Sequence, residues 1–574
     1  MIRTGGELLL DVLQACGVEK IFCSPGTEWA PVWEGLARRQ EQGNTSLTYI
    51  NCRHEMLAVS MAQGYAETSG RIPAVLLHAG VGPLHGAMAI RNACAARAPM
   101  IIMGGETSEH WGDEEIRPQG FHWLGLLSDI GGPAAEVRNY VKWSNRVQSH
   151  DALVDSILRG YEIAAAAPRG PCFISVPAEV LLRQREFHDV VRPVLVVPLP
   201  VPAREDLAKV ARQLLEARNP VIISEQAGKN PGVTAPLVAL AELLTAPVYE
   251  SMLPYASAFP RDHPLFQGMD NREALRQADA VLVLGGLTPW YPPKAGPGKD
   301  AHVIFLDEAP HQERLPHWGY RSDTTIAAEI EPTLKLLADI IGEQTGGKPV
   351  AEERKAGLQQ KHDVMVAGLD EEAVKNKDAV PISPRWFVRE ARAALPDNAM
   401  IVDETIMHTR SINQYAAQPG HYIKAAYGGL GVGFGEALGV KLAHPEQPVV
   451  LMVGDGAFNY NPVLAGLGMS QEYGVPIFVM IFNNGGYKAM GMGHRMIYPE
   501  GAAIRQDTFY GVDITPAPDY AGLAQAFGAY GEKLESPSEI RTAIGRGLEH
   551  LAAGKTVVLD VVLGEHVFRP GGRR

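Results

Sequence analysis

Short apolar segments rich in valine and isoleucine alternate with longer stretches rich in alanine and leucine through most of the 574 residues. An uninterrupted apolar run of strand length is typical of a strand buried on both faces, as in a parallel sheet covered by helices. Such runs occupy residues 73–78, 100–105, 220–224, 280–286, 302–307, 400–404, 449–456 and 477–484. The pattern predicts an α/β fold built from doubly wound parallel sheets.

Two breaks divide this pattern into three units of similar size. The first follows the segment 168–182, where a proline-rich stretch interrupts any regular element. The second is a charged, glycine-interrupted stretch after residue 342. We therefore predict three doubly wound parallel-sheet domains over 1–185, 195–342 and 381–574, with 343–380 as a linker that contains an exposed helix.

Composition narrows the class of protein. The formal net charge is 52 − 65 = −13, and no long run of lysine or arginine indicates a surface for nucleic acid or for an anionic membrane. Five cysteines without a C-x-x-C pair argue against a disulfide framework or a structural zinc site. The first apolar stretch is short and carries Glu7 and Asp11, unlike a signal peptide or a membrane span. These features favour a cytoplasmic protein.

The strongest chemical signal lies in the third unit. The apolar run 449–453 ends in Gly454-Asp455-Gly456, and Asn483-Asn484 follows a second apolar run about 26 residues later. Between them, residues 461–474 have a helical pattern, with Asn461 as the expected N-cap and Pro462 as the first helical residue. Both polar clusters therefore fall at the carboxyl ends of parallel strands, where open α/β sheets bind ligands.

The residue types at these two strand ends suit a metal and a phosphate group. Glycines allow the backbone to approach a diphosphate closely, and Asp455 and the Asn484 carbonyl are the oxygen ligands that Mg²⁺ prefers. Either cluster alone would more often be only a tight turn. The two together, each after a buried strand, favour a binding site.

G-D-G followed after this interval by N-N resembles the signature of the thiamine diphosphate-dependent decarboxylase, carboligase and oxidase superfamily, which includes enzymes similar to acetolactate synthase and benzoylformate decarboxylase. The resemblance implies pyrimidine-binding, central and diphosphate-binding domains in this order, with thiamine diphosphate and Mg²⁺ as cofactors. It implies that Asp455, Asn484 and the backbone carbonyl of Gly486 bind the metal. Gly454, Gly456 and Ala457 are expected to lie against the diphosphate.

The segment 425–439 is similar to the part of the family that holds the middle of the cofactor. The resemblance implies that the Gly428 backbone accepts a hydrogen bond from the 4′-amino group and that Leu430 supports the bent cofactor. A glycine-rich helix-packing seam with one core leucine is the alternative. Glu404 and Thr405, after another strand, are expected to help hold the diphosphate.

In the first unit, Glu55, Ala58, Ala62 and Tyr65 follow helical spacing. From spacing alone, Glu55 is either a helix-capping residue or a buried acid. The segment 51–70 resembles the superfamily's H-E-x-x-A…G-Y-A pattern, which implies that Glu55 hydrogen-bonds N1′ of the cofactor and is catalytic. The superfamily builds each site from two subunits, so the resemblance also implies a homodimer or homotetramer.

Three residues are candidates for contact with the substrate. His78 ends a predicted strand and resembles the histidine that binds substrate and moves protons in benzoylformate decarboxylase, although a lone histidine there can simply complete a turn. Thr27 matches a substrate-binding serine or merely closes an ST-turn, and Gln119 matches a glutamine used in carboligation. His85 departs from the pattern, because relatives often carry asparagine there.

These features predict cleavage of a carbon–carbon bond in a 2-oxo acid by non-oxidative decarboxylation. The alternatives are a carboligase similar to acetolactate synthase or benzaldehyde lyase, which takes an aldehyde acceptor; a lyase of 2-hydroxyacyl-CoA or oxalyl-CoA type; and an FAD-dependent oxidase. The central unit lacks a complete G-x-G-x-x-G motif, which favours a vestigial nucleotide fold over an FAD, ADP or CoA site.

Overall fold

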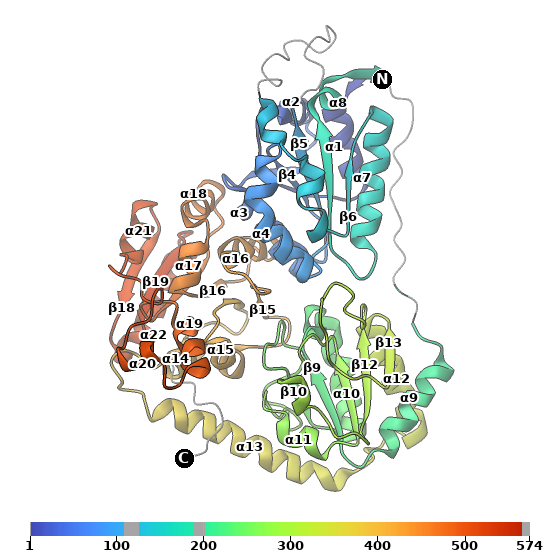
Figure 1. The fold of residues 1–574 in the computed structure, drawn as a ribbon, viewed down its shortest axis with the longest axis vertical. Coiled ribbons are helices and arrows are strands. Elements are labelled where there is room, and N and C mark those ends of the chain that lie inside the picture. The colour runs from blue at the N-terminus through green and yellow to red at the C-terminus, as the bar shows by residue number, and fades with distance from the viewer. Residues whose placement is uncertain (1, 108–124, 187–198, 200, 565–574) are drawn as a thin grey trace.

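The computed structural model describes residues 2–107, 125–186, 199 and 201–564. Three parallel sheets, each covered by helices, form three domains, and the predicted α/β class and three-domain architecture are confirmed (Figure 1). A short antiparallel pair of β1 (Ile2–Thr4) and β8 (Gln184–Glu186) joins the two ends of the N-terminal domain.

The N-terminal domain contains a six-stranded parallel sheet in the order β3-β2-β4-β5-β7-β6. Its strands are β2 (Lys20–Ser24), β3 (Thr48–Asn51), β4 (Ala74–Leu77), β5 (Met100–Glu106), β6 (Trp143–Arg146) and β7 (Pro171–Pro177). Its longer helices are α1 (Gly5–Ala15), α2 (Ala30–Glu41), α3 (Glu55–Ser69), α4 (Val81–Ala95) and α7 (His150–Ala165), and the short ones are α6 (Pro133–Glu136) and α8 (Ala178–Leu182). Strands β4, β5 and β7 are buried along their whole length, as their apolar runs predict.

The central domain has a five-stranded parallel sheet in the order β10-β9-β11-β12-β13. Its strands are β9 (Pro220–Ser224), β10 (Val248–Glu250), β11 (Ala280–Leu284), β12 (His302–Asp307) and β13 (Thr324–Ala327). Its helices are α9 (Arg204–Glu216), α10 (Thr234–Leu244), α11 (Arg272–Gln277) and α12 (Ile330–Thr345). The long helix α13 (Glu352–Val374) then runs from this domain to the C-terminal domain (Figure 1).

The C-terminal domain has a six-stranded parallel sheet in the order β15-β14-β16-β17-β19-β18. Its strands are β14 (Met400–Glu404), β15 (Tyr422–Lys424), β16 (Val449–Gly454), β17 (Phe478–Asn483), β18 (Tyr530–Leu534) and β19 (Val557–Val562). Its helices are α14 (Pro384–Ala394), α15 (Thr409–Ala416), α16 (Gly433–Ala443), α17 (Asp455–Tyr460), α18 (Val463–Tyr473), α19 (Lys488–Ile497), α20 (Ala502–Arg505), α21 (Tyr520–Ala526) and α22 (Ile540–Ala552).

The N-terminal and C-terminal sheets share one topology. In each, the strands lie in the order second, first, third, fourth, sixth, fifth along the chain. The order therefore reverses between β2 and β4 in one sheet and between β14 and β16 in the other. A reversal of this kind opens a crevice at the carboxyl ends of the two strands, which is where such sheets bind ligands.

Helices α3 and α16 join the N-terminal and C-terminal domains. A Cβ at Gly64 would overlap the backbone carbonyl of Glu436, and a Cβ at Gly439 would overlap that of Met61. Because glycine alone allows this approach, the two backbones lie in direct contact. One cluster of buried apolar side chains runs through this contact from Phe22 of one domain to Val558 of the other.

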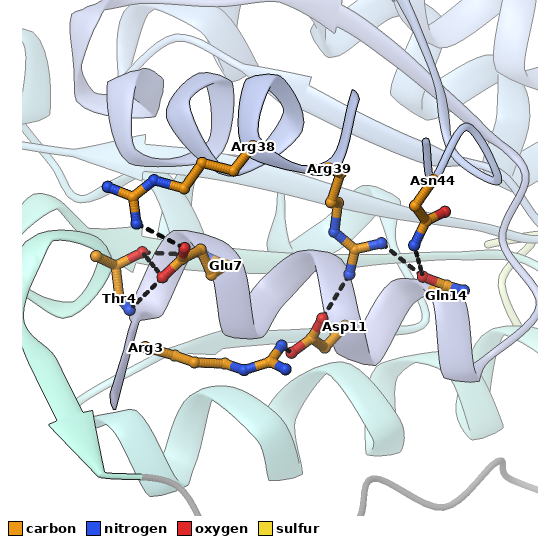
Figure 2. Close-up of polar contacts among 8 residues, drawn as sticks. All are labelled: Arg3, Thr4, Glu7, Asp11, Gln14, Arg38, Arg39 and Asn44. Atoms are coloured by element: carbon orange, nitrogen blue, oxygen red, sulfur yellow. Dashed lines mark hydrogen bonds and ion pairs between the residues drawn. The ribbon is translucent and has the colours of Figure 1, made fainter. Parts of the chain in front are cut away.

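Polar contacts tie α1 to α2 at the surface of the N-terminal domain (Figure 2). Thr4 and Glu7 form a capping box at the start of α1, and Arg38 of α2 donates to the same Glu7 carboxylate at 2.8 Å. In the described part of the chain, no helix combines the length and the apolar character needed to cross a membrane.

Candidate cofactor site

A cavity of about 310 Å³ lies at the carboxyl end of the C-terminal sheet, where β14 and β16 separate. All of the residues of the C-terminal domain predicted to bind the metal or the cofactor line it: Glu404, Thr405, Gly428, Leu430, Gly454, Asp455, Gly456, Ala457, Asn484 and Gly486. They come from four separate segments, which the parallel sheet brings to one edge. Their individual roles stay predictions.

Two buried oxygen atoms in this cavity have no hydrogen-bond partner among the described residues: Asp455 Oδ2 and Asn484 Oδ1. Asp455 also accepts backbone hydrogen bonds from Gly456, Gly485 and Gly486, but burial dominates and raises its pKa to about 6. Buried oxygens are normally hydrogen-bonded, so a pair left without partners on adjoining strand ends is the arrangement expected of metal ligands.

Glu404 organises the loop that carries Gly428 and Leu430. Its side chain is fully buried and accepts hydrogen bonds from the backbone N–H groups of residues 431, 432 and 433 at 2.6, 2.9 and 3.0 Å. Asn461 Nδ2 donates a fourth bond to it at 2.7 Å. Although Glu404 lines the cavity, all of the hydrogen bonds described for its carboxylate come from the protein itself. Thr405 is similarly occupied, because its hydroxyl donates to Asp403 at 2.7 Å.

The cap predicted for the helix after G-D-G is wrong, although the helix itself is present as α18. The N-cap position belongs to Pro462, which makes no side-chain cap, and α18 begins at Val463. The Asn461 side chain instead donates from Nδ2 to Glu404, and its Oδ1 accepts from the backbone N–H of Phe434 at 2.9 Å. Long-range bonds to a buried carboxylate have displaced the local cap.

Gly428 and Leu430 occupy the loop between β15 and α16. Gly428 has φ of +80°, which favours glycine, and Leu430 is half-buried against the apolar cluster shared by the two domains. On the side of the N-terminal domain, the Arg91 guanidinium donates to the carbonyl of Tyr427, the residue before Gly428. The loop is thus held by both domains.

Glu55 is the first residue of α3 and does not cap it. The N-cap is His54, whose Nδ1 accepts from the backbone N–H of Met56 at 3.1 Å. The Glu55 side chain is 16% exposed and one of its oxygens, Oε2, lies 2.7 Å from Nδ1 of His85 on α4. A capping role is therefore excluded for this carboxylate, while its predicted catalytic role stays a prediction.

His78 follows β4 at the crevice of the N-terminal sheet. Its Nδ1 lies 2.9 Å from Oε1 of Glu28, a carboxylate that is 3% exposed. Glu28 also accepts from the backbone N–H of Ala79 at 3.0 Å. The hydrogen bond to Glu28 raises the pKa of His78. Gly26 is required here, because a Cβ at that position would overlap both the His78 ring and the Glu28 carboxylate.

The predicted residues thus form two groups. Thr27 is exposed beside Glu28, so Thr27, His78 and Glu55 all lie on the N-terminal domain, and none of them lines the cavity of the C-terminal domain. Gln119 lies outside the described residues. Two further residues at strand ends were not predicted. His408 follows β14 and lines the cavity, and Glu28 lies in the short 3-10 helix η1 (Thr27–Trp29) that follows β2. Their signal in the sequence is a titratable side chain shortly after a predicted strand.

Three family descriptions match the chain along its length. They are "Thiamine pyrophosphate enzyme, N-terminal TPP binding domain" over residues 3–123, "Thiamine pyrophosphate enzyme, central domain" over 207–337, and "Thiamine pyrophosphate enzyme, C-terminal TPP binding domain" over 406–561. Together they cover well over half of the sequence, in the order that the resemblance implied. The chain belongs to the thiamine pyrophosphate enzyme superfamily.

Relatives of this thiamine pyrophosphate enzyme carry the names of a synthase, an acetyltransferase and a decarboxylase. A probable acetolactate synthase large subunit from Methanocaldococcus jannaschii is 25% identical, covering 99% of this chain and 94% of the relative. A sulfoacetaldehyde acetyltransferase from Rhodobacter capsulatus is 26% identical, over 99% and 96%. A benzoylformate decarboxylase from Pseudomonas aeruginosa is 24% identical, over 98% and 99%.

Solved structures share the fold of this thiamine pyrophosphate enzyme. The benzoylformate decarboxylase of Polynucleobacter necessarius is similar with a TM-score of 0.79 and 21% identity, covering 98% of this chain and 99% of the other. The thiamine diphosphate-dependent 4-hydroxybenzoylformate decarboxylase of Rhodococcus jostii has a TM-score of 0.76 and 23% identity, over 98% and 99%. At these identities the similarity establishes the architecture.

Proposed function

We propose that this enzyme cleaves 2-oxo acids without oxidation, releasing CO₂ and an aldehyde, with thiamine diphosphate and Mg²⁺ as cofactors. The observation that carries the proposal is the pair of His78 and Glu28. Glu28 engages Nδ1 of the ring and raises its pKa, so the protonated form persists to higher pH than in an ordinary histidine. With 37% of the side chain exposed, Nε2 remains for a substrate.

Mg²⁺ fits the C-terminal cavity. Asp455 Oδ2 and Asn484 Oδ1 are hard oxygen donors, buried and without partners among the described residues, and a cation would satisfy both. Gly454, Gly456 and Ala457 would hold a diphosphate beside the metal, since their backbone lines the same cavity.

Thiamine diphosphate supplies an electron sink that allows a bond next to a carbonyl to break. The side chains then have three tasks. His78, as a cation, binds the substrate carboxylate and afterwards supplies a proton from Nε2 to the carbon that has lost CO₂. Glu55 would hold and exchange a proton at N1′ of the cofactor, and Leu430 would pack against the cofactor.

We also propose that two copies of the chain complete each site. Glu55, Thr27 and His78 lie on the N-terminal domain and do not line the cavity that holds the predicted metal ligands. Contact between the N-terminal domain of one copy and the C-terminal domain of another would bring the two groups together. The expected assembly is a homodimer or a tetramer of dimers, which light scattering of the purified protein would measure.

A carboligase is the second candidate. It is supported by the relative named as a probable acetolactate synthase large subunit, which aligns with 99% of the chain. Both reactions need the same activation of the cofactor and differ in what captures the carbon after CO₂ has left. A proton from His78 favours the aldehyde, whereas a second carbonyl substrate favours a new carbon–carbon bond.

A product assay separates these functions. Protein reconstituted with thiamine diphosphate and Mg²⁺ would be offered benzoylformate or pyruvate, each with and without an added aldehyde. We expect CO₂ and free aldehyde, and at least a tenfold loss of this product in His78→Gln, because general acid catalysis contributes about 10²–10⁴ in rate. A 2-hydroxy ketone or acetolactate as the main product would establish the carboligase instead. No turnover of either acid would reject both and leave acyl-CoA lyase chemistry, while a yellow protein would indicate an oxidase.

A further inference from the structure

A cluster of titratable side chains surrounds the carboxylate of Glu55. His85 on α4 contributes Nδ1, which lies 2.7 Å from Glu55 Oε2, and its side chain is 62% exposed. The His54 ring lies beside the His85 ring, with 4.4 Å between their centroids. One nitrogen or oxygen atom from each of these three side chains lies within 4.8 Å of the others.

We propose that His85 is a positioning residue for Glu55: it holds one carboxylate oxygen and supplies the proton that Glu55 passes to N1′ of thiamine diphosphate. The inference rests on the proposed function, because it concerns the same cofactor. It goes beyond it by assigning a role to a residue at which this chain departs from the asparagine that relatives often carry.

The two sides of the carboxylate have different surroundings. Glu55 Oε2 meets His85, whereas no hydrogen bond to Oε1 occurs within the described part of the chain. Helix α4 approaches closely at the next residue, since a Cβ at Gly86 would sit only 3.5 Å from Glu55 Cβ. The ring and the carboxylate are therefore held at a fixed separation by the packing of α3 against α4, and Oε1 remains available for a ligand.

The proposed transfer moves one proton from His85 through Glu55 to the cofactor. Protonated His85 gives its Nδ1 proton to the Glu55 carboxylate, and Glu55 gives a proton to N1′. The net change is one proton lost by the imidazolium and one gained by the aminopyrimidine, while Glu55 returns to the carboxylate. Asparagine can donate a hydrogen bond to Glu55 but has no proton to transfer, because its amide does not titrate in the neutral range.

The groups that face this pair are few. From α3, His54 faces His85 directly, and burial together with the neighbouring His85 lowers the pKa of His54. From the end of β4, His78 interacts electrostatically with Glu55.

The test compares His85→Asn, His85→Leu and the control His263→Asn. His263 also faces a glutamate, at 3.4 Å from Glu242, but lies in the central domain. One readout is the exchange of the C2 hydrogen of bound thiamine diphosphate with solvent deuterium, measured by quenched-flow NMR across pH without any substrate. The other is the imidazole NMR titration of His85 in cofactor-free protein, with and without Glu55→Gln. Cofactor affinity is measured for every variant.

We expect His85→Asn to bind cofactor as wild type does, to slow C2 exchange by roughly tenfold or more, and to change the dependence of that exchange on pH, because asparagine supplies no proton. His85→Leu should exchange more slowly still, and His263→Asn should match wild type. In cofactor-free protein, Glu55→Gln should change the imidazole resonances of His85, because it alters the group that lies 2.7 Å from Nδ1 of the ring. Wild-type exchange rates and pH dependence in His85→Asn would overturn the inference. If the wild-type protein itself binds no cofactor or does not accelerate exchange, the proposed function fails instead.

Discussion

The four hydrogen bonds on Glu404 predict a large effect for the smallest possible change there. Glu404→Gln keeps the shape of the side chain but replaces one oxygen with an NH₂ group. Each carboxylate oxygen accepts from two of the four donors: Oε1 from residues 431 and 432, and Oε2 from residue 433 and Asn461. In either orientation of the glutamine amide, its NH₂ group therefore faces two buried N–H donors, which lose their acceptor.

Each buried donor left unsatisfied costs about 1–3 kcal/mol, so two of them cost about 2–6 kcal/mol. The cost falls on the loop that carries Gly428 and Leu430, because its backbone N–H groups supply three of the bonds. Since 1.4 kcal/mol corresponds to a factor of ten, we expect the amides of 431–433 to exchange with deuterium at least about 30-fold faster than in wild type. Mass spectrometry of peptides that span 428–436 measures this in the cofactor-free protein.

Glu436 provides a matched control. It is as fully buried as Glu404, but no backbone N–H of the loop 431–433 bonds to it within the described residues, and its carboxylate accepts instead from Gln63 at 3.1 Å. Burial and the nearby Glu67 carboxylate raise its pKa well above the ordinary value, so glutamine imitates the protonated form it already favours. Glu436→Gln should change the exchange of the same peptides by less than about fivefold, or about 1 kcal/mol. Unchanged protection in Glu404→Gln, or equal effects in both variants, would refute this reasoning.

Three further predictions concern the site. Glu55→Gln should keep cofactor affinity while turnover falls by about 10²–10⁴, which calorimetry and steady-state kinetics check; full activity would disprove the role assigned to Glu55. Asp455→Asn should weaken Mg²⁺ binding by more than about tenfold, or 1.4 kcal/mol, in calorimetric titration, because it removes the anionic ligand, and unchanged affinity would place the metal elsewhere. Glu28→Gln should lower the pKa of His78 in NMR titration, since the hydrogen bond to Glu28 raises it. The folded-state pKa of His78 lies above its unfolded value. The folding free energy lost in Glu28→Gln should therefore be largest below the unfolded pKa of histidine and should disappear as pH rises through the folded pKa. A loss of stability that grows with pH would contradict the proposed interaction between His78 and Glu28.

The sequence predicts the architecture well because its signal is local and repeated. An apolar run such as 449–453 has to be buried on both faces, and β16 is buried from Val449 to Val453. G-D-G and N-N then meet at one edge because parallel strands place their carboxyl ends together. The order of the strands, and with it the position of the crevice, depends on long-range pairing and is visible only in the structure.

The contacts within the site were less predictable. Asn461 has the local pattern of an N-cap, but its side chain hydrogen-bonds the Glu404 carboxylate, which lies 57 residues away in the sequence. Glu28 reads as an ordinary acid in a loop until β4 brings His78 beside it, 50 residues further along the chain. Spacing can place a residue on a helix or at a strand end, whereas its partner across the fold has no signature in a single sequence.

The close contact between α3 and α16 has a consequence for how this enzyme can change over time. Helix α16 starts at Gly433, directly after the loop held by Glu404, and α3 starts at Glu55. Side chains larger than hydrogen at Gly64 or Gly439 would push the helices apart and shift both starting points together. The glycine contact therefore fixes, within one chain, the spacing between Glu55 and the loop that carries Gly428 and Leu430. Because the proposed assembly assigns these two parts to different sites, a substitution at either glycine would disturb two sites at once, and we expect it to be tolerated less well than changes in the strand-end loops.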